Sequence, residues 1–237
     1  MSSLIKKILI FFSLISTLFI ITIISILWVY SNKLPDYKYL KKYKPSVSSK
    51  LYSGNGVLVS DFSSEKRIFI PFEAIPNKVI NAFLSAEDKN FFKHPGVDAK
   101  GVVRAFKNNI FNLLYSKRLE GASTITQQVA KNFLLSNEVS ISRKTKEALL
   151  AIKIDATLSK SRILELYLNQ IYLGAGTYGV AAASNRYFNK SLEELDLSEI
   201  SFLAALPKAP SRYNPKKNYD KSLSRRNWVL KRMFINN

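Results

Sequence analysis

Glu87 and Asp88 are the first residues in the chain whose types and spacing could do chemistry. Ile80, Phe83 and Leu84 precede Glu87 by seven, four and three residues, so all three share its face of a helix. Glu87 therefore extends an apolar stripe, and burial would raise its pKa toward the range that suits general acid–base catalysis. The alternative is a helix-terminal acid in an ordinary ion pair, and spacing alone favours that alternative.

A second polar cluster lies on a predicted helix that follows Gly121. Thr124, Gln128 and Lys131 recur at i, i+4 and i+7, and Asn132 is adjacent to them. Because a helix N-terminus presents free backbone N–H groups, this face could hold a phosphate or pyrophosphate. A solvated face is the alternative, although such faces are usually richer in Glu and Lys.

Arg143 and Glu147 form a third pattern, at i and i+4. They could make a surface salt bridge of about 0.3–0.5 kcal/mol. They could also place a second acid beside a phosphate-binding guanidinium, because Arg suits bidentate recognition of oxyanions. A fourth segment, residues 163–179, mixes core residues with polar Glu165 and Asn169, and we interpret it as mostly architectural.

A mainly α-helical domain with a small β element must position these residues. Residues 51–52 and 57–59 flank a turn and predict a hairpin, with a third strand at 67–70. The predicted helices are one capped by Asn77, residues 102–114, 124–135, one capped by Ser142 that runs to 158, 161–173, 196–207 and 222–234. The apolar helix at 102–114 carries interspersed basic residues, so it is either a membrane-touching element or an ordinary core helix.

Composition narrows the classes of function. The 237 residues suit one domain with a short appendage, and the absence of Cys excludes disulfides and thiolate metal sites. A single His argues against a His-based zinc site. The formal charge of +19 favours an anionic partner, or reflects a generally basic proteome. Nucleic acid is a poor candidate partner, because no base-reading or stacking motif occurs.

The N-terminal segment predicts a membrane anchor. Residues 8–29 contain no charge and are dominated by Ile, Leu and Phe, and a spanning helix needs roughly 20 apolar residues. We predict an uncleaved anchor at 1–32, a linker at 33–49 and one domain at 50–237. Lys residues on both sides of the segment leave the topology unsettled, because the charge rule weakens before a long domain.

Five segments, taken in order, resemble glycosyltransferase family 51, the peptidoglycan glycosyltransferases. The similarity runs from about residue 51 to the C-terminus and looks closest to the N-terminal half of class A penicillin-binding proteins. Ala122 stands where many members carry a second glycine, and Asp155 replaces a more usual glutamate. The five matching segments are residues 87–96, 121–132, 143–147, 165–174 and 204–210.

The resemblance implies a lysozyme-like α-helical fold with a membrane-facing jaw, acting on lipid II, a disaccharide-pentapeptide on undecaprenyl pyrophosphate. Glu87 would be the base that deprotonates the acceptor 4-hydroxyl, and Glu147 a second catalytic carboxylate. Lys131 and Arg143 would stabilise the departing pyrophosphate, while His94 is assigned a structural role. The further active-site positions implied by the resemblance are Asp88, Phe91, Thr124, Gln128 and Asn132.

The resemblance also implies cofactor, location and partners. It implies a divalent cation such as magnesium and no organic cofactor. The expected location is the bacterial cytoplasmic (inner) membrane, crossed once, with the catalytic domain on the outer, periplasmic face. The expected partners are lipid II, the nascent glycan chain and the membrane, with cell-wall synthesis proteins as further candidates and no nucleic acid.

Class A proteins continue into a transpeptidase, and the Lys-Thr-Gly motif of that domain does not occur in these residues. We therefore expect either part of a class A protein or a monofunctional one, which would not bind penicillin. Two rival functions stay open. One is a lysozyme-like hydrolase, because two carboxylates also suit glycoside cleavage. The other is a non-catalytic membrane protein that binds an anionic polymer through the basic residues of 207–237.

Overall fold

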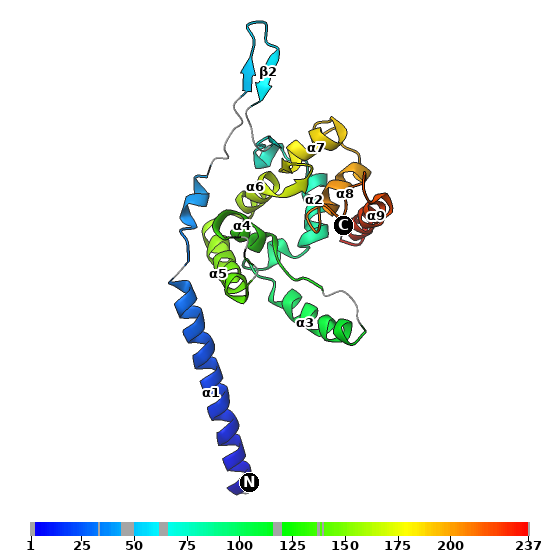
Figure 1. Ribbon diagram of the computed structural model, residues 1–237. Coiled ribbons are helices and arrows are strands. Elements are labelled where there is room, and N and C mark those ends of the chain that lie inside the picture. Colours follow the sequence, from blue (N-terminus) through cyan, green and yellow to red (C-terminus); the bar gives the residue numbers. More distant parts are fainter. Residues whose placement is uncertain are drawn as a thin grey trace.

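The chain folds into a mainly helical domain from which one long N-terminal helix extends (Figure 1). The computed structural model describes residues 3–32, 34–43, 50–61, 66–115, 120–136, 138 and 140–236. At the centre lies α6 (Lys160–Gln170), in which every residue from 163 to 169 is buried. Helices α4 (Ile125–Leu134) and α7 (Val180–Phe188) pack against it. The same core cluster also includes residues of α2 (Asn77–Glu87), α5 (Ile141–Thr157), α8 (Leu197–Ala205) and α9 (Tyr219–Asn236). The predicted mainly α fold is thus confirmed, while the likeness to lysozyme stays a prediction.

Two small sheets accompany the helices. Strands β1 (Lys50–Tyr52) and β2 (Leu58–Asp61) pair antiparallel across a tight turn, which confirms the predicted hairpin. The second sheet has the order β3 (Lys66–Arg67), β5 (Thr177–Tyr178), β4 (Tyr172–Gly174). The predicted third strand is therefore wrong in its length, and it pairs with β5 and not with the hairpin. The predicted helix at 161–173 is also too long, because its last residues form β4.

Local capping explains where several helices begin. Thr124 and Asp196 each make the predicted reciprocal capping box with the side chain three residues later. Two predicted caps are wrong. The backbone enters α2 through Pro76 without a side-chain cap, and Ser140, not Ser142, accepts the hydrogen bond at the start of α5. Ser residues two positions apart carry the same local signal, so the sequence pattern could not choose between them.

The N-terminal helix α1 (Ser3–Ser31) runs away from the domain, and its described large apolar side chains are exposed (Figure 1). Within the described part of the chain, no helix combines the length and the apolar character required to cross a membrane. The spanning helix predicted at 8–29 is therefore not confirmed.

The helix α3 (Ala99–Leu114) lies at the end of the domain toward which α1 extends, and the β1–β2 hairpin lies at the opposite end (Figure 1). Only Gly101 and Ala105 of α3 are buried, whereas Val103, Phe106 and Leu114 are among its many exposed apolar residues. The alternative of an ordinary core helix is therefore wrong for this segment.

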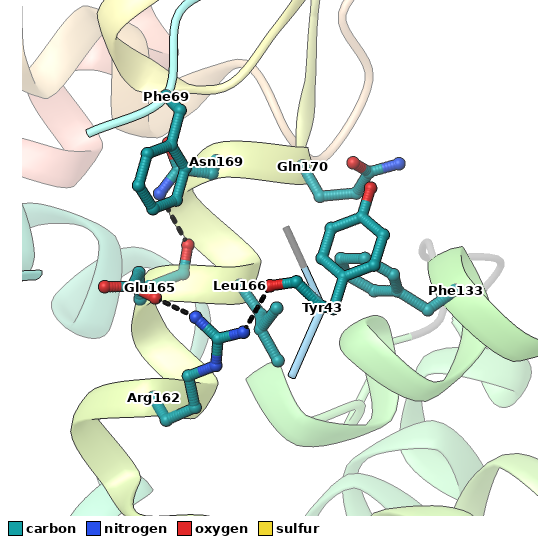
Figure 2. A pocket seen from close by; sticks show the side chains of 8 residues that line it. All are labelled: Tyr43, Phe69, Phe133, Arg162, Glu165, Leu166, Asn169 and Gln170. Carbon is teal, nitrogen blue, oxygen red and sulfur yellow. Dashed lines mark hydrogen bonds and ion pairs between the residues drawn. The ribbon is translucent and has the colours of Figure 1, made fainter. Parts of the chain in front are cut away.

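Residues 34–43, part of the predicted linker, pack on the domain. Figure 2 shows the last of them, Tyr43, beside Phe133 and Arg162. Leu40 is fully buried, and the Arg162 guanidinium donates to the carbonyls of Leu40 and Tyr43 at 3.1 and 2.6 Å. The Tyr43 ring meets Phe133 edge to face at 4.9 Å between centroids. The Tyr39 hydroxyl donates to the Phe133 carbonyl at the end of α4. This segment, which includes the 3₁₀ turn Lys38–Lys41, therefore joins α1 to α4 and α6 by fixed contacts.

Candidate active site

Glu87 stands at the C-terminal end of α2, where the buried face of that helix reaches a cleft. Its side chain is only 14% exposed. The Gln128 amide donates to Oε2 at 2.9 Å, and Arg225 Nη2 lies 3.9 Å from Oε1. Burial raises the pKa of Glu87, although Gln128, Arg225 and Lys208 act in the opposite direction. The predicted direction of the pKa is therefore supported, and the contact with Arg225 is too long for a close ion pair.

The carboxylate of Asp88, by contrast, is engaged by hydrogen bonds to other residues of the protein. Both of its oxygens lie 3.0 Å from His94 Nε2, and Oδ2 also accepts the backbone N–H of Ile125 at 3.0 Å. Ile125 is the first residue of α4, so Asp88 joins the end of α2 to the start of α4. Asp88 and His94 are both buried. This geometry supports the structural role predicted for His94 and gives Asp88 a positioning role.

The loop between Asp88 and α3 packs against the start of α4 and against α5, and so supports the positions of Asp88 and His94. The Thr124 hydroxyl, which caps α4, also donates to the Gly96 carbonyl at 2.5 Å. Gly96 has a φ of +86°, and a Cβ added there would fall on the Ala151 carbonyl of α5. Phe91, in the 3₁₀ turn Phe91–Lys93, is fully buried in the core, so it supports the loop and does not line the cleft.

Cationic side chains gather where α4 and α5 run together. Lys131 and Arg143 both lower the pKa of Lys144, after the larger effect of burial. Lys144 donates to a Glu147 oxygen at 2.7 Å and to the Ser123 hydroxyl at 2.8 Å, and Arg143 pairs with the other Glu147 oxygen. Glu147 is 2% exposed and is thus held between two cations.

The cleft beside Glu87 encloses about 1570 Å³ of empty space, including the part open to solvent. Of the predicted site residues, the structure brings four to its wall: Glu87, Asp88, Thr124 and Gln128. Phe91 and His94 are buried away from its lining, and Lys131, Asn132, Arg143 and Glu147 do not line it. Its remaining charged lining residues are Lys89, Asp98, Arg104, Glu120, Lys208, Arg225 and Arg232.

Comparison with known proteins agrees with this arrangement of motifs. A family described as Transglycosylase matches residues 55–234. The chain belongs to the transglycosylase family. The resemblance to the peptidoglycan glycosyltransferases, and with it the prediction of a transglycosylase enzyme, is confirmed at the level of the family.

Named relatives of this transglycosylase chain are penicillin-binding proteins. It is 54% identical over 209 residues to penicillin-binding protein 1A of Rickettsia felis, covering 88% of this chain and 26% of that protein. It is 44% identical over 202 residues to penicillin-binding protein 1A of Escherichia coli, covering 85% and 23%. A crystal structure of penicillin-binding protein 1A from Haemophilus influenzae matches with a TM-score of 0.42 and 29% identity, covering 81% and 18%. The chain thus spans about a quarter of the length of the curated relatives it matches.

Arg225 is the functional candidate of this transglycosylase that sequence reasoning missed. It approaches Glu87, and its guanidinium lies 3.9 Å from the centroid of the Trp228 ring. One signal could have identified it. The apolar Val229 follows Arg225 by four residues and so shares its face of the helix, and the structure buries both.

Proposed function

We propose that this chain is a peptidoglycan glycosyltransferase that polymerises lipid II into glycan strands, with Glu87 as the general base. The observation that carries the proposal is a buried carboxylate with a raised pKa at the wall of a cleft that also presents several cations. A base with a raised pKa accepts a proton more readily near neutral pH, which is the property the reaction needs.

In the proposed reaction, Glu87 takes the proton from the 4-hydroxyl of the acceptor sugar. The acceptor oxygen forms a bond to the anomeric carbon of the lipid-linked chain, and the bond from that carbon to undecaprenyl pyrophosphate breaks. The electron pair leaves with the pyrophosphate, so positioned cations can stabilise the developing charge without a strong acid. Gln128, which donates to Glu87 Oε2, orients the carboxylate for this transfer.

The other acids of the cleft are less suited to the same role. Asp98 caps α3 through the Gly101 N–H and accepts a hydrogen bond from Asn90, which together lower its pKa. Asp88 is occupied by His94 and by the first N–H of α4. Glu120 accepts from the Asn108 amide at 2.7 Å. Burial raises the pKa of Glu87, whereas the pKa of Asp98 is lowered, and this difference favours Glu87 as the base.

Two groups of cations lie on different elements, one acting on Glu87 directly and one reaching the edge of the cleft, where Lys144 donates to the lining residue Ser123. Lys131, Arg143 and Lys144 belong to α4 and α5, and we propose that they receive the departing pyrophosphate. Glu147 orders this group by pairing with two of its members, which is a positioning role. Arg225 and Lys208 lie close enough to Glu87 to lower its pKa.

The family resemblance implies a divalent cation, but the described residues do not form a ligand set for one. Among the residues that the structure describes, no group of three or more His, Asp or Glu side chains is placed to hold a metal ion. Both Glu147 oxygens already pair with cations. No step of the proposed reaction therefore uses a metal ion.

We further propose that the enzyme works at the outer face of the bacterial cytoplasmic membrane, where lipid II and the nascent glycan chain meet it. The exposed apolar side chains of α1 and α3, which lie toward the same end of the molecule, support contact with lipid (Figure 1). Retention of the chain in the membrane fraction after high-salt washing tests this contact, and quantitative release would contradict it.

The decisive experiment measures polymerisation of purified lipid II, with glycan length read on a gel. Glu87→Gln keeps the shape of the side chain and its acceptor oxygen for Gln128, so we expect the fold to survive. The rate should fall about 10²- to 10⁴-fold, which is the usual contribution of a general base. Glu73→Gln, at an exposed acid on the turn Phe72–Ala74, is the matched control and should leave the rate unchanged. Glycan synthesis by Glu87→Gln at the normal rate would remove Glu87 from the proposed role.

A further inference from the structure

A second hollow continues the Glu87 cleft along α9. The two share Glu120, Lys208, Arg225 and Trp228 as lining residues, so a ligand that reaches Glu87 can extend into the second hollow. We call this hollow the α9 groove. Nothing in the proposed chemistry at Glu87 uses the residues that the groove adds to these four.

One face of α9 builds much of the groove. Lys221, Ser224, Arg225 and Trp228 recur at i, i+3, i+4 and i+7, which places them on the same side of the helix. Arg212 faces them from the segment between α8 and α9. Arg212 and Lys221 are exposed, and neither makes an ion pair with another described residue. Their charges are therefore available to a ligand.

The groove carries charges of both signs. Its cations are accompanied by Glu120 and by Asp220 in the first turn of α9. A compact diphosphate would meet the cations but leave these two carboxylates unmatched, whereas a ligand with carboxylates and amines at separate positions can match both signs. The cation group of α4 and α5, which contains Lys131 and Arg143, lies apart from this groove and is the better diphosphate site.

Trp228 supplies an apolar surface between the groove and the cleft. It is 41% exposed although the Arg225 guanidinium lies 3.9 Å from its ring centroid. Tyr213, which is buried, adds a second aromatic ring to the lining. Ring surfaces beside a few fixed polar groups are typical of sites that bind a small organic ligand, and a sugar ring can pack its C–H face on such a surface.

We propose that the α9 groove binds the peptide-bearing sugar of the substrate, with Arg212 and Lys221 on the peptide carboxylates and Trp228 against the sugar ring. The assignment rests on the proposed function, because it takes the substrate to be a sugar that carries a peptide. It makes the groove a determinant of specificity for the charge of that peptide.

The test is a binding titration of the full chain in detergent with a soluble disaccharide-peptide that has neither lipid nor diphosphate. The sequence has two Trp residues, so Trp28→Phe leaves Trp228 as the only indole whose fluorescence can report binding. The ligand is used in two forms, one with free peptide carboxylates and one with those carboxylates amidated. Inorganic pyrophosphate is the third probe.

The test variant is Arg212→Gln with Lys221→Gln, both at exposed positions, so we expect it to fold normally. The free-carboxylate ligand should bind about tenfold more weakly, which corresponds to about 1.4 kcal/mol. The amidated ligand should bind the variant and the parent equally. Arg186→Gln with Lys231→Gln removes the same two charges from exposed positions outside the groove and should leave both affinities unchanged.

Three outcomes would overturn the assignment. The first is that neither ligand form binds the parent saturably. The second is that the double substitution weakens the binding of both ligand forms equally. The third is that it weakens only the binding of pyrophosphate, which would make the groove a phosphate site. Polymerisation of lipid II is measured separately. If the parent polymerises lipid II but the double substitution leaves the ligand affinity unchanged, only the groove assignment is contradicted. If the parent does not polymerise lipid II but the affinities change as expected, only the proposed function is contradicted.

Discussion

Arg162→Ala should destabilise the chain more than any ordinary surface substitution, because Arg162 holds the segment between α1 and the domain (Figure 2). The guanidinium donates to the carbonyls of Leu40 and Tyr43 and pairs with Glu165. The side chains of Arg162 and Glu165 are 22% and 12% exposed, so water reaches them only in part. Removing Arg162 leaves two inward carbonyls without this donor and leaves Glu165 with the Phe72 N–H as its remaining partner.

The magnitude follows from those contacts. Breaking a fully buried ion pair by removing one partner costs about 3–5 kcal/mol. Hydrogen bonds to charged groups contribute about 1.5–3 kcal/mol each. Because partial exposure lets water replace some of these contacts, we expect the lower part of the range, a loss of about 3 kcal/mol in the free energy of unfolding.

The measurement is urea unfolding of the detergent-solubilised chain, followed by circular dichroism. Arg186→Ala, at an exposed arginine of α7, is the control and should change stability by less than about 0.5 kcal/mol. Adding Glu165→Gln to Arg162→Ala removes the unpaired charge, so the double variant should be more stable than the sum of the single effects by about 1–2 kcal/mol. A loss for Arg162→Ala no larger than for Arg186→Ala, or strict additivity in the double variant, would refute this account of the junction.

Three further predictions concern the site. Since burial raises the folded-state pKa of Glu87 above its ordinary value of 4.5, the protonated form contributes stability that is fully present below 4.5 and is lost as pH rises through the folded-state pKa. Glu87→Gln should therefore gain stability relative to the parent between pH 4 and pH 7 in unfolding titrations, and a relative loss over that range would contradict the burial. Thr124→Ala should lose about 1 kcal/mol of stability as an N-cap, while Thr124→Ser should keep most of it, and equal losses by thermal unfolding would argue against the capping box. Gly96→Ala should cost at least about 1–2 kcal/mol from its positive φ alone, with more from the contact with Ala151, whereas Gly121→Ala, where an added Cβ meets nothing, should be nearly neutral in the same assay.

Local patterns in the sequence predicted the local features of the fold. The capping boxes at Thr124 and Asp196 were predictable because both partners lie within one helical turn. Residues 172–178 were not, because β4 and β5 are short and are completed by β3 from a distant part of the chain. Strands of two or three residues carry too little alternation to be distinguished from the end of a helix.

The same limit applies to the site. The stripe of Phe83 and Leu84 before Glu87 indicated burial, and the structure agrees with that direction. The partners that define the environment of Glu87 come from elsewhere, Gln128 from α4 and Arg225 from the last helix. No spacing rule connects residues so far apart in sequence, so the pattern could nominate the carboxylate but not its surroundings.

The polymerising enzyme and the rival hydrolase differ in whether a second carboxyl group beside Glu87 takes part in the reaction. A glycosidase needs two carboxyl groups that flank the scissile bond, one protonated and one free to act as a base or nucleophile. Glu147 is buried, lies outside the lining of the cleft and pairs with both Arg143 and Lys144, so it is not open to a sugar. Asp98, within the cleft, accepts the Asn90 amide on one oxygen and the Gly101 N–H on the other, so it is not free to act as a second base or nucleophile. A single base near fixed cations suits transfer from a leaving group that departs as an anion, and this is why the geometry favours glycan synthesis over glycan cleavage.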